Sequence, residues 1–283
     1  NYVLGPGDEV IIDIWGNSEL TVRQVISPEG NINVSNIGPI YLNGKRIQEA
    51  SSYLKAMFSR IYSDLASENP STFLKVSLGQ IRSIQVNVMG EIVMPGTYML
   101  PSLATVFHAL YAAGGVNNVG TLRDVVLYRN GKAFKHVDVY DYIMNGNNSF
   151  DITLQDGDLI NVGTYEKIVT VVGKVKRPMR YEMKGEESLT QLLEYAGGFA
   201  SDAYKKNVNV SRKGDSEFQI YTVNNADFAD FILADGDSIM IDPIISRYEN
   251  RVTVDGAVYR PGNYAINSSI KTVKDLINLV EGP

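Results

Sequence analysis

The sequence predicts an α+β fold in which an N-terminal domain is followed by tandem copies of one small unit. A signature of the form Gly-x-x-x-x-Pro-x-x-Tyr occurs three times, with its glycines 173 − 90 = 83 and 256 − 173 = 83 residues apart. Each signature precedes a short amphipathic helix, and the first two copies continue into strand-like runs of alternating residues. A constant period of this kind indicates one supersecondary unit repeated along the chain.

Length and composition exclude several classes of protein. The chain has 283 residues, enough for about two domains, and 44% apolar with 20% charged residues is a globular composition. Its net charge is 26 − 32 = −6, which argues against a nucleic-acid binder, because neutralising phosphates requires clustered Lys and Arg. The absence of Cys excludes thiol catalysis, disulfides and thiolate metal sites. With only two His as well, the sequence predicts no metal and no cofactor.

Residues 1–80 are predicted to form the separate N-terminal domain. It opens on the motif Gly5-Pro6-Gly7-Asp8, which we interpret as a turn that leads into a buried strand. Apolar residues recur on one face from Ile47 to about Leu65, and this spacing predicts a long amphipathic helix. The expected strands of the domain are residues 10–15, 21–26, 31–34, 37–42 and 72–78.

The repeats are predicted to be small β-grasp domains, two complete and one truncated. Each complete copy reads as hairpin, helix, hairpin, short helix and strand, which places one helix across a small mixed sheet. The expected copies are residues 81–167 and 168–248, and residues 249–283 hold only a first hairpin and a helix. Ser188 is an expected helix N-cap, and the Gly-Gly pairs are expected to end the helices in left-handed conformation. The repeat positions singled out as structural are Gly90, Pro95, Gly96, Gly114, Gly115, Gly173, Pro178, Gly197, Gly198, Gly256, Pro261 and Gly262.

Both ends of the sequence are expected to be cuts within a longer protein. The chain starts at Asn1 without a leader and enters a structural motif at once, and it stops directly after a helical pattern. Its longest apolar runs are far shorter than the roughly 20 residues that a membrane helix needs. Any membrane anchor is therefore expected outside this sequence.

Three Gly-Asp pairs are candidates for a functional role, at residues 7–8, 157–158 and 236–237. Carboxylates in loops can bind a cation or a sugar, but the alternating acidic ligands and the final Glu of a calcium-binding EF-hand loop are missing. Asp and Gly also dominate turns for conformational reasons, so a turn before a buried strand is the favoured interpretation.

Contacts with a polymer or another subunit are predicted for one tyrosine in each repeat and for a basic cluster. The tyrosine of Pro-Gly-x-Tyr could stack on a sugar, or it could simply pack across its hairpin. The basic cluster could meet an anionic polysaccharide, or it could be a solvated face. The candidates are Tyr98, Tyr181, Tyr264, Lys174, Lys176 and Arg177.

Residues 1–80 resemble the polysaccharide biosynthesis/export domain of bacterial outer-membrane polysaccharide export proteins. The resemblance rests on Tyr2-Val3-Leu4-Gly5-Pro6-Gly7-Asp8, on Ser27-Pro28-Glu29-Gly30, and on Ile37-Gly38-Pro39-Ile40 with Asn43-Gly44. The later copies resemble soluble-ligand-binding β-grasp repeats through Gly-x-Val-x-x-Pro-Gly-x-Tyr and the Ala-Gly-Gly helix end. The second copy departs from this pattern, because Met179 stands where the others have Gly96 and Gly262.

The resemblance implies a lipid-anchored periplasmic protein that forms rings around a conduit for capsule or exopolysaccharide. It also implies an outer-membrane segment that has no counterpart in this sequence, and an inner-membrane polysaccharide copolymerase as partner. No set of nucleophile, base and orienting residue is visible, so we expect no enzymatic activity. The alternative is a monomeric periplasmic protein that binds or processes glycans; a processing enzyme should carry two carboxylates in a cleft.

Overall fold

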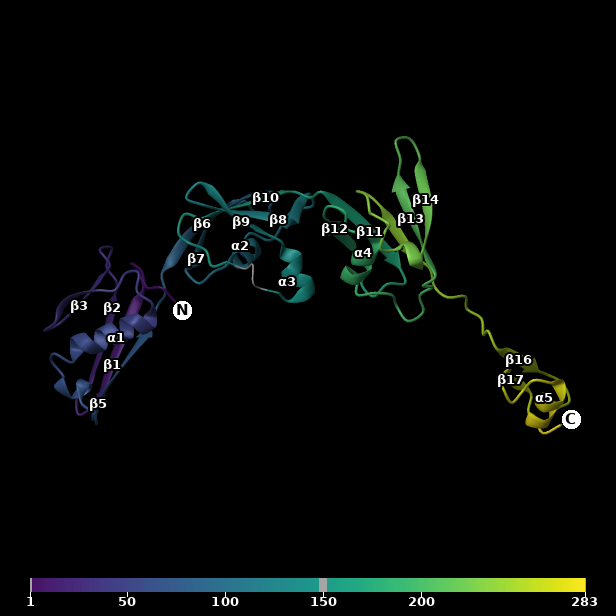
Figure 1. The fold of residues 1–283 in the computed structure, drawn as a ribbon, viewed down its shortest axis with the longest axis horizontal. Helices are drawn as coiled ribbons and strands as arrows, with labels where there is room; N and C mark the ends of the chain where they lie inside the picture. The colour runs from purple at the N-terminus through teal and green to yellow at the C-terminus, as the bar shows by residue number, and fades with distance from the viewer. Residues whose placement is uncertain (1, 148–151, 283) are drawn as a thin grey trace. The chain divides into compact units, whose positions relative to one another are not determined.

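The computed structural model describes residues 2–147 and 152–282, and its ribbon is drawn in Figure 1. It is a mixed α/β protein, as the sequence predicts, with five-stranded sheets in the two complete repeats. The chain divides into two compact units. The first contains Asn1–Val169, Arg180–Glu187 and Leu233–Gly236, and the second contains Thr170–Met179, Ser188–Ile232 and Asp237–Pro283.

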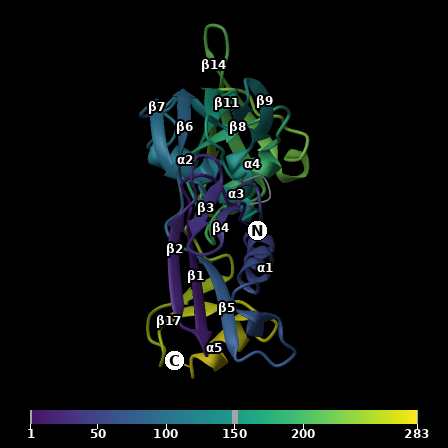
Figure 2. The same ribbon diagram turned by 90° about the vertical axis from the view of Figure 1, so that its left-hand side faces the viewer.

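The N-terminal domain is built on a three-stranded antiparallel sheet of order β2-β1-β5, with a separate β3-β4 hairpin. Helix α1 runs alongside β5 (Figure 2) and buries Ala50, Leu54 and Phe58. Alternation along β1 places Val10 and Ile12 in the same core. The elements are β1 (Glu9–Gly16), β2 (Leu20–Val25), β3 (Asn31–Val34), β4 (Gly38–Tyr41), α1 (Ile47–Phe58), the 3₁₀ helix η1 (Ser63–Ala66) and β5 (Thr72–Leu78).

The predicted helix from Ile47 to Leu65 is too long by 65 − 58 = 7 residues, about two turns. The α-helix ends at Phe58, and Leu65 lies in η1 instead, although its side chain is buried on the predicted face. The carboxylate of Asp64 accepts hydrogen bonds from the backbone N–H and the hydroxyl of Ser71, both at 2.9 Å. These bonds hold a turn that a continuous helix would not allow. The apolar spacing therefore predicts the buried face correctly but not the backbone break.

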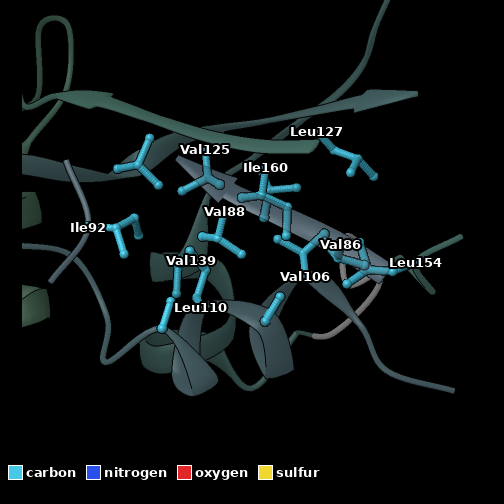
Figure 3. Packing of buried hydrophobic residues seen from close by; sticks show 14 of the residues in the cluster. Val86, Val88, Ile92, Val106, Leu110, Val125, Leu127, Val139, Leu154 and Ile160 are labelled. Carbon is cyan, nitrogen blue, oxygen red and sulfur yellow. The ribbon is translucent and has the colours of Figure 1, made fainter. Parts of the chain in front are cut away.

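The first complete repeat contains a sheet of order β7-β6-β10-β8-β9, in which β10 pairs parallel to β6 and the other pairs are antiparallel. Val106 and Leu110 of α2 point toward Val88 and Ile160 of the sheet (Figure 3), and all four are at most 4% exposed. Its elements are β6 (Ser83–Gly90), β7 (Gly96–Pro101), α2 (Val106–Ala112), β8 (Gly120–Arg129), β9 (Lys132–Val137), α3 (Val139–Asn145) and β10 (Leu159–Thr164).

The second complete repeat has the same topology, with sheet order β12-β11-β15-β13-β14 and a parallel β11–β15 pair. A capping box of Ser188 and Gln191 begins α4, so the predicted N-cap is confirmed. Its elements are β11 (Lys167–Gly173), β12 (Arg180–Met183), α4 (Leu189–Tyr195), β13 (Asn207–Lys213), β14 (Phe218–Asn224), the 3₁₀ helix η2 (Asn225–Asp227) and β15 (Ser238–Ile241).

The remaining segment consists of β16 (Arg251–Val254), β17 (Gly262–Ala265) and α5 (Val273–Leu279). Its two strands form a sheet of their own. This is the first hairpin and helix of the repeat, as predicted.

A hydrogen bond between the hairpin turn and the end of the helix recurs in all three copies. The backbone N–H groups of Val93, Lys176 and Tyr259 donate to the carbonyl oxygens of Gly115, Gly198 and Gly282, at 3.0, 3.1 and 3.1 Å. Both predicted Gly-Gly pairs have φ values between 77° and 81°, so each helix ends in the left-handed region. The signature and the glycines that end the helix are thus parts of one local structure.

The first glycine of the signature is required by the strand that closes each sheet. A Cβ at Gly90 would lie 2.1 Å from the carbonyl oxygen of Val162, and one at Gly173 would lie 2.1 Å from that of Ile241. Both glycines also have a φ of 87°, which disfavours any side chain. Gly256 has a φ of 95°, but a Cβ there would meet nothing within 4 Å.

Candidate functional site: arginine–aspartate pairs and the cavity beside Arg82

The three Gly-Asp pairs form turns before strands, and their aspartates are almost completely buried. Asp8, Asp158 and Asp237 are 0%, 1% and 1% exposed. The backbone N–H three residues earlier donates to the carboxylate at 2.8 Å in the first two turns, from Gly5 to Asp8 and from Gln155 to Asp158. These contacts support the turn interpretation. A buried carboxylate is costly without a partner of opposite charge, however, and no such partner is predicted from the sequence for these aspartates.

Each of these aspartates is paired with an arginine. Arg129 and Arg212 approach Asp158 and Asp237 side-on, with Nε to one carboxylate oxygen at 2.9 Å and Nη2 to the other at 2.7 Å. In both arginines Nη2 also donates to a backbone carbonyl, that of Thr153 at 3.2 Å or of Ile232 at 3.0 Å. Charge-assisted bidentate pairs of this kind are strong and directional. The pairs therefore tie the second hairpin of each repeat to the turn before its closing strand.

Arg82 binds the third aspartate, Asp8, in a different manner. Only Nη1 of Arg82 contacts the carboxylate, at 2.6 Å from Oδ2, and its backbone N–H donates to Oδ1 at 2.8 Å. The hydroxyl of Tyr2 also donates to Oδ1, at 2.6 Å, and lies 2.6 Å from the hydroxyl oxygen of Ser102. Burial, followed by the hydrogen bond to Asp8, raises the pKa of Tyr2 to about 12. Tyr2 therefore remains a neutral donor at physiological pH.

A cavity of about 400 Å³ lies beside this pair in the first compact unit. Its wall comes from four segments: the start of the chain, the residue before β6, the loop that follows β7 and the loop that precedes β10. Polar and apolar side chains alternate around it, and the lining includes Tyr2, Arg82, Ser102, Leu103, Thr153 and Gln155. This is a polar cavity with an arginine in its wall, a chemistry suited to oxygen-rich ligands.

A second buried ionic network holds residues 180–187 within the same unit. Arg123 donates from Nε to both oxygens of Asp138 at 3.0 Å, and from Nη1 and Nη2 to Glu187 at 3.0 and 2.9 Å. Glu182 accepts from the backbone of Leu122 at 2.7 Å and from the hydroxyl of Thr121. One guanidinium thus holds two carboxylates at once.

Burial dominates the electrostatics of this network. It raises the pKa of the Glu182 carboxyl, since the bonds from Thr121 and Leu122 offset only part of the lost hydration. Burial alone would lower the pKa of Arg123, but the bond to Glu187 and the charges of Asp138 and Glu187 outweigh it and raise that pKa. Arg123 therefore stays charged, and Glu182 is the group whose ionisation is costly.

The predicted basic cluster is partly occupied by contacts within the protein. Lys174 forms an ion pair with Asp202 at 2.6 Å, and Nη2 of Arg177 donates to the carbonyl of Tyr195 at 2.8 Å. Lys176 has an exposed side chain. Lys174 is therefore neutralised by Asp202, whereas Arg177 is exposed like Lys176, and the backbone carbonyl that it binds carries no net charge.

The three tyrosines of the signature have structural contacts. Tyr98 donates its hydroxyl to the carbonyl of Met94 at 2.5 Å, and Tyr264 donates to that of Arg260 at 2.7 Å, so both close their hairpin turns. Tyr181 is only 1% exposed. Its predicted contact with a polymer or a subunit does not fit this structure, because the ring has no accessible face.

The two histidines make local contacts. His108 takes part in the capping box of α2 with Thr105, and His136 lies 2.7 Å from Asp124. Within residues 2–147 and 152–282, no three His, Cys, Asp or Glu side chains come together in a group that could hold a metal ion. None of the helices in these two ranges has the length and apolar character to span a membrane.

Three segments of the chain match known protein families. Residues 1–89 match the polysaccharide biosynthesis/export protein family, and residues 84–162 and 168–221 each match an SLBB domain family. The chain is homologous to polysaccharide export proteins. The sequence-based resemblance is confirmed in its order as well as in its parts: an export domain precedes SLBB domains in tandem.

Two curated relatives illustrate the extent of this homology. The polysialic acid transport protein KpsD of Escherichia coli is 29% identical over 199 residues, which cover 69% of this chain and 34% of the relative. The EPS I polysaccharide export outer membrane protein EpsA of Ralstonia nicotianae is 26% identical over 264 residues, or 83% of this chain and 67% of the relative. The chain therefore spans about a third of the length of KpsD.

The sequence did not lead us to predict the arginines of the buried pairs. A signal for two of them exists, because Arg129 and Arg212 are separated by 212 − 129 = 83 residues, the period of the repeat. Arg82 and Arg123 have no such signal. Residue 206, one period after Arg123, is a lysine, and Asp8 and Glu187 lie 74 and 64 residues from the arginines that bind them.

Proposed function

We propose that this chain is the periplasmic portion of an outer-membrane polysaccharide export protein, and that it forms part of the wall of a conduit for capsule or exopolysaccharide. The observation that carries the proposal is the order of domains along one chain, an export domain followed by SLBB repeats, with homology to EpsA over 83% of the chain. The role is architectural, and no bond of the polymer is made or broken.

The internal pairing of buried charges supports an architectural role. Asp8, Asp158 and Asp237 are each neutralised by an arginine, and Glu187 is held by Arg123. A glycan-processing enzyme needs two carboxyl groups that reach the same glycosidic bond, one of them able to give up a proton. These buried carboxylates hold turns and loops in place instead.

Export through a conduit also requires assembly, so the full-length protein is proposed to form closed homo-oligomers. Ring closure uses heterologous contacts repeated around an axis. Exposed apolar side chains on edge strands are suited to such contacts, and Phe218 and Ile220 on β14 are 72% and 76% exposed. Residues 1–283 by themselves are expected to be monomeric or weakly associated. The driving force for transport would come from an inner-membrane polysaccharide copolymerase.

The export role is tested by deleting the gene and complementing it with the full-length protein. The proposal predicts that the deletion strain stops displaying polysaccharide at its surface, accumulates polymer inside the envelope, and recovers on complementation. Polymer of normal chain length should accumulate, because no glycosidic bond is processed. Normal surface display in the deletion strain would contradict the proposal, and a changed chain length with normal display would favour the glycan-processing alternative.

Assembly is tested separately, by measuring the mass of the full-length protein in detergent and of residues 1–283 in buffer. A closed oligomer is expected for the first and a monomer or weak oligomer for the second. A tight ring formed by residues 1–283 alone would show that contacts within this chain are sufficient for assembly, contrary to the proposal.

A further inference from the structure

Among the described residues, the hydrogen bonds of the Arg82 guanidinium all come from Nη1. Arg129 and Arg212 use the Nε and Nη2 edge for their aspartates. Arg82 uses Nη1 alone, for Asp8 at 2.6 Å and for the Tyr2 hydroxyl and the Val3 carbonyl at 3.4 Å. Within residues 2–147 and 152–282, no group accepts from its Nε or Nη2. That edge is the one that binds two oxygens in parallel in bidentate pairs.

The unused edge belongs to a side chain that lines a cavity. The side chain of Arg82 is 30% exposed, against 14% for Arg129, and it contributes to the 400 Å³ cavity with Ser102 and Gln155. At the rim, Leu103 is 53% exposed. Such a volume admits a monosaccharide unit, with polar walls for its hydroxyl groups and an apolar rim for its C–H face.

Occupation of the cavity by a carboxylate is electrostatically feasible because Asp8 is already saturated. Its two oxygens accept four hydrogen bonds, from Gly5, Tyr2 and two donors of Arg82. The same molecule shows that one guanidinium can hold two carboxylates, since Arg123 binds Asp138 through Nε and Glu187 through Nη1 and Nη2. Two further acids adjoin the site in sequence: Asp156, next to Gln155, accepts a hydrogen bond from the backbone of Gln85, and Glu9, next to Asp8, accepts one from the backbone of Gln80 at 3.0 Å.

We propose that the cavity beside Arg82 is a subsite for the carboxylate of an acidic saccharide, with Nε and Nη2 of Arg82 as its bidentate donors. The proposal rests on the proposed export function, and it narrows the substrate class to polymers with carboxylated sugars. Arg82 lies two residues before residues 84–89, where the export-domain match and the first SLBB match overlap, so the proposed polymer contact adjoins the start of the first repeat.

The direct test is an NMR titration of the 283-residue chain with trigalacturonic acid, and with its methyl ester as the uncharged control. The acid is expected to shift the Arg82 Nε–H resonance and to bind about tenfold or more tightly than the ester, as expected for a charge-assisted pair. Equal binding of acid and ester, or no shift at Arg82, would overturn the proposal.

Two substitutions test the site without removing the buried pair. Leu103→Glu places a negative charge at the exposed rim and is expected to weaken binding of the acid about tenfold or more, whereas Leu103→Gln, of the same size, should retain it.

Arg82→Lys keeps a cation for Asp8 but lacks two parallel donors, so it should also lose the preference for acid over ester. The control Lys213→Ala removes an exposed charge from the second repeat and should leave binding unchanged. Equal effects of Leu103→Glu and Leu103→Gln, or loss of binding in Lys213→Ala, would contradict a specific subsite.

The titrations and the gene deletion can refute the subsite and the export role separately. If the deletion strain loses surface polysaccharide while the chain does not distinguish the acid from the ester, the subsite is refuted and the export function stands. If surface display is normal in the deletion strain, the export function is refuted whatever the titration shows.

Discussion

The first complete repeat and residues 249–283 begin in the same way and end differently. Both have a hairpin, a helix, and a hydrogen bond from the hairpin turn to the glycine after the helix. In the first repeat, Val106 on the helix is 0% exposed. Its counterpart Val273 on α5 is 77% exposed, although Val280 at the end of that helix is buried.

The difference shows which properties are local. The hairpin and the helix arise from the signature and its nearby glycines in all three copies. Burial of the helix requires the later strands, which in the first repeat include β10 beside β6. Gly256 retains the backbone conformation of Gly90 although no strand crowds it. The signature therefore encodes a half-unit whose stability depends on what covers it.

The largest expected effect comes from breaking a buried ion pair in the complete repeat. Arg129→Met leaves Asp158 buried and unpaired, and it should cost about 3–5 kcal/mol of the stability of that repeat. Local unfolding free energies from hydrogen exchange of β8 and β10 would measure this loss. The matched control is Arg260→Met in the third segment, where the pair with Glu281 is largely exposed and its loss should have little effect. A loss below about 1 kcal/mol for Arg129→Met would show that the pair is not a main stabilising contact.

The next largest difference in stability between the two regions is expected when the first glycine of the signature is replaced by alanine. Gly90→Ala drives a Cβ against the Val162 carbonyl at positive φ, and it should cost about 3 kcal/mol from strain and overpacking together. Gly256→Ala meets only the conformational penalty, about 1 kcal/mol. Urea titration followed by a hydrogen-exchange probe in each region gives both values. Equal costs would mean that the closing strand does not constrain Gly90.

Replacing a helix valine by alanine in each region tests how much the burial of that side chain contributes to stability. Val106→Ala removes two buried methyl groups and should cost roughly 2 kcal/mol, including the cavity that it leaves. Val273→Ala should stay within about 0.5 kcal/mol, because its side chain is already in water. Thermal unfolding of the two variants, monitored residue by residue by NMR, would distinguish them. A larger loss for Val273→Ala would indicate that α5 is covered in solution, by another part of the chain or by a neighbouring molecule.

The smallest expected effect is a pH dependence in the Arg123 network, which has no counterpart in the described part of residues 249–283. The folded state raises the pKa of Glu182, so between its ordinary value near 4.5 and that raised value the folded protein binds more protons than the unfolded chain. Stability from this group is therefore present at low pH and is lost as pH rises through that window.

Glu182→Gln should remove this dependence, because an amide does not ionise. The Gln oxygen can accept from the backbone N–H of Leu122, and its NH2 group can donate to the hydroxyl oxygen of Thr121 in place of the bond that the carboxylate accepts. Between pH 4 and 7, the protection of residues 180–187 against hydrogen exchange should therefore fall with rising pH in the natural protein relative to the variant. Parallel pH profiles in the two proteins would show that Glu182 is not the titrating group.

The features that could be predicted from the sequence are those that repeat along the chain or that depend on neighbouring residues. The 83-residue period predicted two complete β-grasp units and a half-unit, and the Gly-Gly helix ends were placed correctly because they follow from local backbone preference. Helix α1 was predicted too long, because the apolar spacing continues to Leu65 while the backbone leaves the helical conformation at Tyr62, with φ −106° and ψ 77°.

The ionic contacts were not predictable in the same way. Glu182 occupies the position of the exposed Met99 one period earlier, so repetition gives no hint that it is buried against Thr121. Arg82 contacts Asp8 across 74 residues, and only the fold brings them together. Pairing of distant charges depends on the tertiary structure, whereas turns and helix ends depend on their neighbours.

Native-state hydrogen exchange of the 283-residue chain tests the central claim most directly, that the later strands rather than the hairpin and helix make a repeat stable. The amides of β6 are predicted to exchange only through opening of the whole repeat, and those of β16 about 100-fold faster through local opening. Equal protection of β6 and β16 in a monomeric sample would contradict the claim, because it would show that the hairpin and helix are stable without a closing strand.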